Sequence, residues 1–204
     1  MDLIEAGAGT LRRHLWELAR FDFFHPTLGR DWLAKPARRV LDIGAGDGRF
    51  DQILLTDVLE HIGDDHGFLA DATRRYPWGN ARVLISVPAW PGLFSRHDQH
   101  LGHFRRYTPR SARDLIEVAG LRMHRSGGLF HALLPVRALA VGLQRARQEE
   151  TPVRGLGDWF GRPLITAAIA GILKAEGELS RLFAKTGLGV PGVKWWALCE
   201  IPRS

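Results

Sequence analysis

A short hydrophobic run that leads directly into closely spaced glycines constrains the fold more than any other feature. Residues 39–43 (RVLDI) form a β-type run, and GAGDG follows at 44–48. Glycine lacks a Cβ and adopts positive φ readily, so a ligand can approach the backbone of such a turn closely. In open α/β sheets, nucleotide-like ligands bind beyond the carboxyl ends of the strands. The spacing G-x-G-x-G differs from the dinucleotide fingerprint G-x-G-x-x-G, and a lone glycine-rich turn is also compatible with an ordinary loop.

The hydrophobic periodicity along the rest of the chain predicts an α/β fold. Predicted strands lie at 39–43, 52–56, 82–87, 121–130 and 193–201, and predicted helices at 10–24, 64–75, 110–119, 131–147 and 163–186. The strand–helix–strand order over 52–87 predicts a right-handed parallel unit. Thr108 followed by Pro109 predicts an N-cap and a first helical residue. The stretch 88–107 is predicted to be a loop.

One domain is expected, in three stretches of sequence. Residues 1–37 are an N-terminal helical segment, residues 38–148 form the core, and residues 149–204 hold a linker, a long helix and a final strand that complete the same domain. Of the 204 residues, 45% are hydrophobic and 25% are charged, which is the usual balance for a globular domain.

The expected compartment is the cytoplasm. The single cysteine, Cys199, cannot form an internal disulfide and offers no thiolate metal site. No signal peptide is visible, and the longest apolar run, 164–173, is about half of what a bilayer crossing needs. Peripheral contact of the protein with a membrane remains an alternative.

The basic residues, which give a formal net charge of +6, are mostly arginine pairs spread along the chain. Such a pattern favours a solvated surface, with phosphates, anionic lipid headgroups or RNA as alternative partners. No DNA partner is expected, and RNA is the less favoured macromolecule because no basic stripe is interleaved with aromatic residues.

Two stretches together resemble the class I S-adenosylmethionine-dependent methyltransferases. VLDIGAGDG at 40–48 is similar to the first motif of that family, and FDQILLTDVLEH at 50–61 is similar to its fourth strand running into the next helix. The resemblance implies an α/β, Rossmann-like, mostly parallel sheet with helices on both faces and an antiparallel final strand. It also implies S-adenosyl-L-methionine as the cofactor.

The resemblance also implies roles for individual residues. The cofactor-binding residues would be Asp42, Gly44, Gly46, Gly48 and Asp57. His61 follows in the same stretch and is a candidate general base, because imidazole titrates near neutral pH. A histidine that is bonded to backbone at a helix start is the alternative interpretation.

A stretch rich in histidine and arginine, SRHDQHLGHFRRY at 95–107, resembles the H-D-x-x-x-G-H-x-R-R-Y stretch of a bacterial methyltransferase group linked to cell-envelope or natural-product glycans. The resemblance implies an acceptor site, with His103 as a second candidate base and Arg105 or Arg106 as an anion clamp. The substrate-binding residues would be His97, Asp98, Arg105, Arg106 and Tyr107.

Two other interpretations of this stretch stay open. Its arginines could simply hold a structural loop. His97, His100 and His103 could ligate a metal, but the lack of cysteine and of a helical i, i+4 histidine pair disfavours this, so no metal is expected.

The resemblance breaks after Gly48. In the family, the first motif is followed by a helix, a second strand whose terminal acid holds the ribose hydroxyls, another helix and a third strand, which need roughly fifty residues. Here only Arg49 and Phe50 precede the fourth-strand stretch, so the ribose acid and the residues that frame adenine have no counterpart. Either the gene carries a deletion at this point, or the sequence omits a segment that the protein contains.

The connection between the first two predicted strands is also short for a parallel crossover. In the intact fold, the strands at 40–43 and 52–56 are parallel neighbours, and parallel neighbours need a crossover of about a dozen residues. Residues 44–51 span at most ~28 Å, which leaves little slack for retracing a five-residue strand of ~17 Å. A continuous chain is therefore expected to make these strands antiparallel or to abandon the glycine-turn geometry. Parallel strands would imply a physical break between Gly48 and Gln52.

The inferred reaction is transfer of a methyl group from S-adenosylmethionine to an oxygen or nitrogen of a small or lipid-linked acceptor, catalysed mainly by positioning. Three alternatives remain. They are an inactive remnant of the fold that serves as a binding or scaffold protein, an RNA methyltransferase, and a different nucleotide-binding enzyme, which the G-x-G-x-G spacing disfavours.

Overall fold

The computed structural model describes residues 20, 22–24, 40–42, 52–75, 81–147 and 163–202. The glycine turn at 44–48, most of the predicted helix 10–24 and the predicted linker 149–162 lie outside the described residues.

The described strands form one five-stranded sheet in the order β1-β2-β3-β5-β4. The strands are β1 (Val40–Asp42), β2 (Gln52–Thr56), β3 (Arg82–Pro88), β4 (Arg122–Leu129) and β5 (Lys194–Glu200). The first three are mutually parallel, and β5 is antiparallel to both β3 and β4. The predicted mostly parallel sheet with an antiparallel final strand is therefore confirmed.

The predicted helices within the described residues are present. They are α2 (Asp65–Arg75), α4 (Pro109–Val118), α5 (Leu133–Arg147) and α6 (Pro163–Thr186). Thr108 caps α4 as predicted, because its side chain accepts a hydrogen bond from the Ser111 amide over 3.0 Å.

The prediction of a loop over 88–107 is wrong in part, because this stretch holds two short helices, η2 (Pro91–Leu93) and α3 (Arg96–His100). A capping box starts α3, in which the Ser95 amide donates to the Asp98 carboxylate over 2.9 Å. This five-residue helix is too short and too polar to show an apolar periodicity. His61 ends another short helix, η1 (Leu59–His61), instead of starting a longer one.

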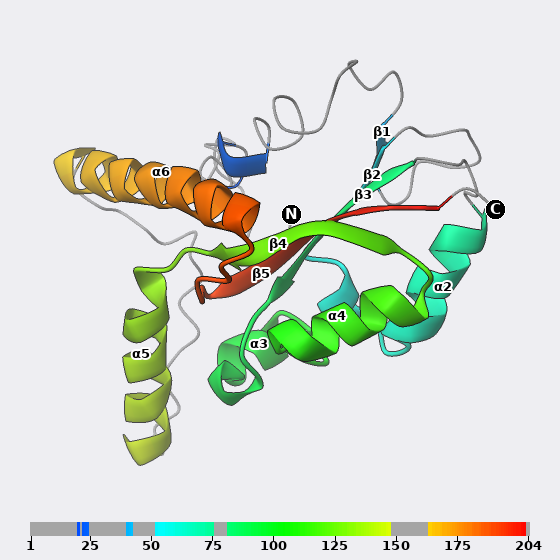
Figure 1. Ribbon diagram of the computed structural model, residues 1–204. Helices are drawn as coiled ribbons and strands as arrows, with labels where there is room; N and C mark the ends of the chain where they lie inside the picture. Colours follow the sequence, from blue (N-terminus) through cyan, green and yellow to red (C-terminus); the bar gives the residue numbers. More distant parts are fainter. Residues whose placement is uncertain are drawn as a thin grey trace.

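The sheet is the middle of three layers, with α2, α3 and α4 on one face and α6 on the other (Figure 1). Alternation along the strands explains this arrangement, since successive side chains point to opposite faces. In β5, Trp195, Ala197 and Cys199 join the core beneath α2 and α4. Trp196 and Leu198 join the second core with Phe23, Phe24 and two residues of α6, Leu173 and Ala184.

β1 and β2 are neighbours and run parallel, as expected for the intact fold. The predicted antiparallel alternative is therefore wrong. The physical reason is the short first strand: β1 has three residues, and Val40 lies opposite Gln52. The chain must return only about 7 Å along the strand and about 5 Å sideways, a path that residues 43–51 can cover. Those residues lie outside the described part, so the expectation for the glycine turn stays untested.

Among the described strands, β1 lies at the edge of the sheet. In the doubly wound order 3-2-1-4-5-6, the first strand has the fourth on one side and the second on the other. An edge position for β1 is the arrangement that loss of the second and third strands would leave.

Among the helices that the structure describes, none is both long and apolar enough to cross a membrane.

We predict that Cys199 reports on the integrity of this sheet. It is fully buried in β5, and burial raises the pKa of its thiol to about 12. A thiol reagent at about pH 8 should therefore leave the folded protein unlabelled and react fully in denaturant, because the thiolate is the reactive form. Intact-mass spectrometry before and after unfolding measures this directly. Fast labelling of the folded protein would contradict the central position of β5.

Candidate functional site

Three residues that follow parallel strands have strained backbones. Asp57 follows β2 with φ of 59°, Trp90 follows β3 with φ of 67°, and Phe130 follows β4 with φ of 61°. They are the non-glycine residues with positive φ in the described part of the chain. Side chains other than glycine rarely adopt this region, and such strain clusters at functional sites. All three lie at the carboxyl edge of the parallel strands, where α/β sheets bind ligands.

Asp57 lies where the sequence predicts it, at the end of β2, which is the parallel neighbour of β1. Its carboxylate pairs with Arg20 and with Lys194 at the start of β5. Burial raises the pKa of Asp57, but the charges of Lys194 and Arg20 outweigh it and hold the pKa below its ordinary value. The sequence did not reveal these two partners, because only the fold brings them from 37 and 137 residues away.

A buried carboxylate organises the H-D-x-x-x-G-H-x-R-R-Y stretch. Asp98 is fully buried and accepts hydrogen bonds from Arg106 Nε over 2.8 Å, from Arg137 over 3.1 Å and from the Ser95 hydroxyl over 2.9 Å. The His103 ring nitrogen Nδ1 lies 3.1 Å from the same carboxylate. Burial raises the pKa of Asp98, but the His103 hydrogen bond and the charge of Arg106 outweigh it, so the pKa is well below its ordinary value.

A second buried carboxylate, Asp65 at the start of α2, holds the other end of the stretch. Tyr107 donates its hydroxyl to Asp65 over 2.7 Å, and Arg105 Nη1 donates to the other carboxylate oxygen over 2.6 Å. The same hydroxyl contacts the Leu59 carbonyl at 3.1 Å. Burial and the neighbouring Asp65 carboxylate raise the pKa of Tyr107, so it stays a hydrogen-bond donor at neutral pH. Sequence analysis did not single out Asp65; the acidic pair at 64–65, at the start of the predicted helix 64–75, was the available signal.

Three residues of the predicted substrate-binding set are buried in this network. Asp98, Tyr107 and Arg106 are 0%, 3% and 9% exposed, and each is committed to buried partners. They position the loop. For these residues the burial and the contacts favour the structural-loop interpretation.

The other two predicted substrate-binding residues are more accessible. Arg105 keeps a side-chain exposure of 35%, although its guanidinium is bound by Asp65 and the Gly63 carbonyl. His97 is half-buried on α3, where burial and the charge of Arg137 lower its pKa.

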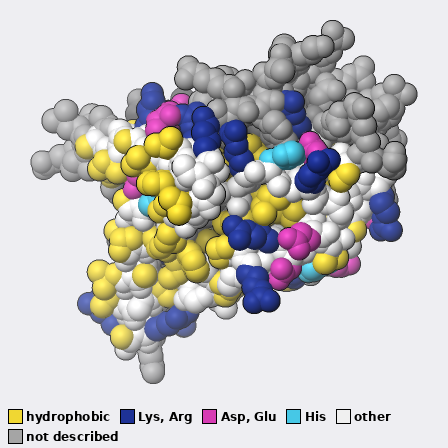
Figure 2. Space-filling view, in the orientation of Figure 1, with side chains coloured by type: hydrophobic (Ala, Val, Ile, Leu, Met, Phe, Trp, Pro, Cys, Tyr) yellow, Lys and Arg dark blue, Asp and Glu magenta, His cyan; other side chains and the backbone are white. Residues whose placement is uncertain are grey.

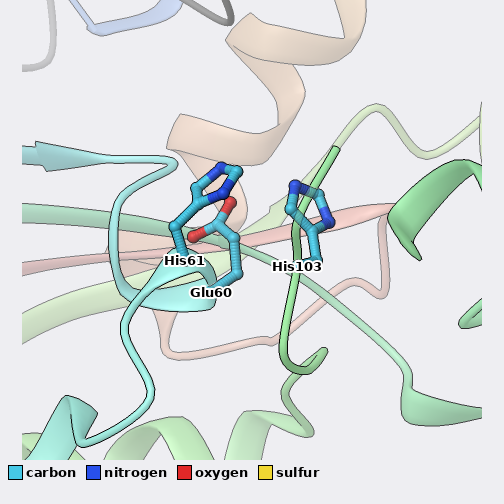
Figure 3. A group of neighbouring side chains, drawn as sticks. All are labelled: Glu60, His61 and His103. Atoms are coloured by element: carbon cyan, nitrogen blue, oxygen red, sulfur yellow. The ribbon is translucent and has the colours of Figure 1, made fainter. Parts of the chain in front are cut away.

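The two predicted bases do come together. The rings of His61 and His103 are in edge-to-face contact with centroids 4.6 Å apart. Glu60, which is 1% exposed, lies beside them, and Figure 3 shows the three side chains converging from two segments. The Phe104 amide donates to the Glu60 carbonyl over 2.7 Å and ties these segments together. We call Glu60, His61 and His103 the histidine–glutamate cluster.

The histidine–glutamate cluster differs from the histidine set considered in the sequence. Its three ligand atoms lie within 4.8 Å of one another, whereas His97 and His100 are not members of a ligand group in the described part of the chain. Two imidazoles and a carboxylate can transfer a proton, accept hydrogen bonds from a bound substrate or bind a cation.

We predict that replacing Asp98 by alanine destabilises the fold strongly, because it leaves the Arg106 and Arg137 guanidinium groups without their buried partner. Breaking a buried ion pair costs about 3–5 kcal/mol. Asp71 is the matched control, since it pairs with Arg74 on the surface with 56% of its side chain exposed. Its replacement should change the free energy of unfolding by about 1 kcal/mol or less. Urea denaturation of both variants tests this, and similar losses would contradict the anchoring role of Asp98.

No protein-family model matches the chain, and no curated protein is similar to it in sequence. Solved structures with a similar fold include an S-adenosylmethionine-dependent methyltransferase from Archaeoglobus fulgidus, with 9% identity and a TM-score of 0.39 over 76% of this chain and 60% of that one. The cyclase SpnF shows 16% identity and a TM-score of 0.38 over 80% and 53%. A Haemonchus contortus phosphoethanolamine N-methyltransferase in complex with S-adenosyl-L-methionine shows 12% identity and a TM-score of 0.38 over 76% and 34%. The chain thus spans about a third to three fifths of the length of these remotely similar structures.

Proposed function

We propose that this protein transfers a methyl group from S-adenosyl-L-methionine to an oxygen or nitrogen atom of a small or lipid-linked acceptor. The observation that carries the proposal is the position of the histidine–glutamate cluster. It lies at the carboxyl edge of the strands that bear the two family-like motifs, because Glu60 and His61 lie in η1, which follows β2 and Asp57 directly in the chain. Fold alone does not determine chemistry, so the proposal depends on these side chains and motifs.

In the proposed reaction, the acceptor atom attacks the sulfonium methyl in line. The bond from sulfur to the methyl carbon breaks, the sulfonium becomes a thioether, and the acceptor loses a proton. The cofactor would lie along the end of β1, against Asp42, Gly44, Gly46, Gly48 and Asp57. His61 or His103 would accept the proton, since imidazole titrates near neutral pH.

A lipid-linked acceptor is supported by the outer surface of two helices. Val136, Leu139 and Leu143 of α5 are 63%, 65% and 46% exposed, and Ile172 and Leu182 of α6 are 54% and 58% exposed. Figure 2 shows hydrophobic side chains gathered over α5 and α6. Exposed apolar patches of this kind mark protein or membrane contacts, so peripheral membrane contact is part of the proposal.

One observation favours a second candidate, an inactive remnant of the fold that serves as a binding or scaffold protein. Among the described strands nothing lies beyond β1, where the family has the strand whose terminal acid holds the ribose hydroxyls. Cofactor binding separates the two candidates.

We predict that S-adenosylmethionine binds weakly to a chain with a verified mass of 22.8 kDa. Losing the charged hydrogen bonds to the ribose costs about 1.5–3 kcal/mol, which is roughly a 10- to 150-fold loss of affinity. Titration calorimetry measures it. Micromolar affinity would refute the missing-segment account, and no binding at millimolar cofactor would favour the scaffold candidate.

We also predict that His103→Ala lowers transfer of a labelled methyl group to lipid and glycan extracts by roughly 10²- to 10⁴-fold, the usual contribution of a positioned base. Affinity for S-adenosylmethionine should stay within about twofold, because in this proposal His103 acts on the acceptor and does not bind the cofactor. His100→Ala is the matched control, since His100 is exposed on the neighbouring helix α3. A loss of cofactor affinity equal to the loss of transfer would contradict this division of roles.

A further inference from the structure

We propose that the histidine–glutamate cluster binds one divalent first-row transition-metal ion. Glu60, His61 and His103 each offer one ligand atom, and these atoms lie within 4.8 Å of one another. They come from two segments more than forty residues apart in the sequence, so the fold, not local spacing, brings them together. In the part of the chain that the structure describes, this is the group that assembles three such ligands.

The donor set indicates the class of ion. Imidazole nitrogens suit zinc, cobalt, nickel and ferrous iron, whereas magnesium and calcium prefer sets made of oxygen atoms. Two histidines and one glutamate are also the protein ligands of several catalytic zinc sites, which keep a further position open for water or substrate. The cluster therefore predicts a transition-metal ion with at least one open coordination position.

Small side-chain movements would complete the site. Metal–ligand bonds of about 2.0–2.2 Å bring ligand atoms to roughly 3–3.5 Å from one another, so the present spread must close by on the order of 1 Å. The backbone on both sides is already held in place, because the Phe104 amide donates to the Glu60 carbonyl. Rotation about the side-chain bonds is then sufficient.

The neighbourhood of His103 matches that of a metal ligand. Ligating histidines usually engage a carboxylate or carbonyl through their second ring nitrogen, which fixes the tautomer and the ring orientation. Here Nδ1 of His103 lies 3.1 Å from the Asp98 carboxylate, so Nε2 would be the ring nitrogen that coordinates the proposed ion. Asp98 is itself held by Arg106 and Arg137. The buried anchors of the loop thus orient one ligand of the proposed site.

The metal site goes beyond the proposed function and does not depend on it, because ion binding requires neither cofactor nor acceptor. The two are nevertheless connected through shared side chains. A ring nitrogen that coordinates an ion cannot accept a proton at the same time. With the ion bound, an acceptor hydroxyl at the open position would instead lose its proton more readily because of the charge of the metal.

The test is metal binding by chelator-treated protein, titrated with Co²⁺ under visible absorption and with Zn²⁺ by calorimetry. We expect one ion per chain and a d–d absorption band typical of four- or five-coordinate Co²⁺. Glu60→Gln, His61→Ala and His103→Ala should each weaken binding by at least tenfold. Matched controls are His100→Ala and Glu117→Gln, both exposed on neighbouring helices, and they should bind like the unaltered protein.

Folding is checked separately, by circular dichroism and by the melting temperature with and without Zn²⁺. A bound ion stabilises only the state that binds it, so Zn²⁺ should raise the Tm of the unaltered protein and of the controls, and raise that of Glu60→Gln less at the same Zn²⁺ concentration. The proposal is overturned if the unaltered protein binds no ion at micromolar concentration or if the three variants bind as it does. Loss of binding in His100→Ala would overturn it as well, because it would place the ion on the other histidines of the loop.

Discussion

The buried carboxylate of Asp98 is the interaction on which the candidate site depends. A charge that is fully removed from water must be paired and hydrogen-bonded, or it destabilises the fold. Its partners come from the start of α3, from α5 and from the loop that follows α3. One carboxylate therefore fixes the relative positions of three segments, and the His103 ring is held in the same network.

This network separates two kinds of residue within one motif-like stretch. Arg105, Arg106 and Tyr107 point into buried or half-buried contacts with Asp65 and Asp98 and serve to hold the loop. His103 is held by the same loop and faces Glu60 and His61. Arg106, one of the two arginines predicted to form an anion clamp, thus holds the carboxylate that contacts His103.

Much of the architecture follows from patterns that the sequence displays. The continuous apolar runs of β3 and β5 and the apolar spacing in α6 predict those elements closely, because both faces of these two strands are buried. Three features could not be predicted in this way. The helix α3 is too short and polar to be periodic, the pairing of Asp57 with Lys194 joins residues 137 positions apart, and Glu60 approaches His103 only in the folded chain. The sequence left the pairing of β1 with β2 open between a parallel and an antiparallel arrangement, and the structure shows the parallel one.

The place of β5 in the sheet has a consequence for the order in which the molecule can assemble. β5 is the latest described strand in the sequence, yet it fills the position between β3 and β4 and pairs with both along seven residues. Until it inserts, β3 and β4 each present an open row of backbone donors and acceptors. Contacts between such distant segments also form slowly. During synthesis on the ribosome, the earlier strands therefore remain incomplete and prone to association until residues 194–200 have emerged.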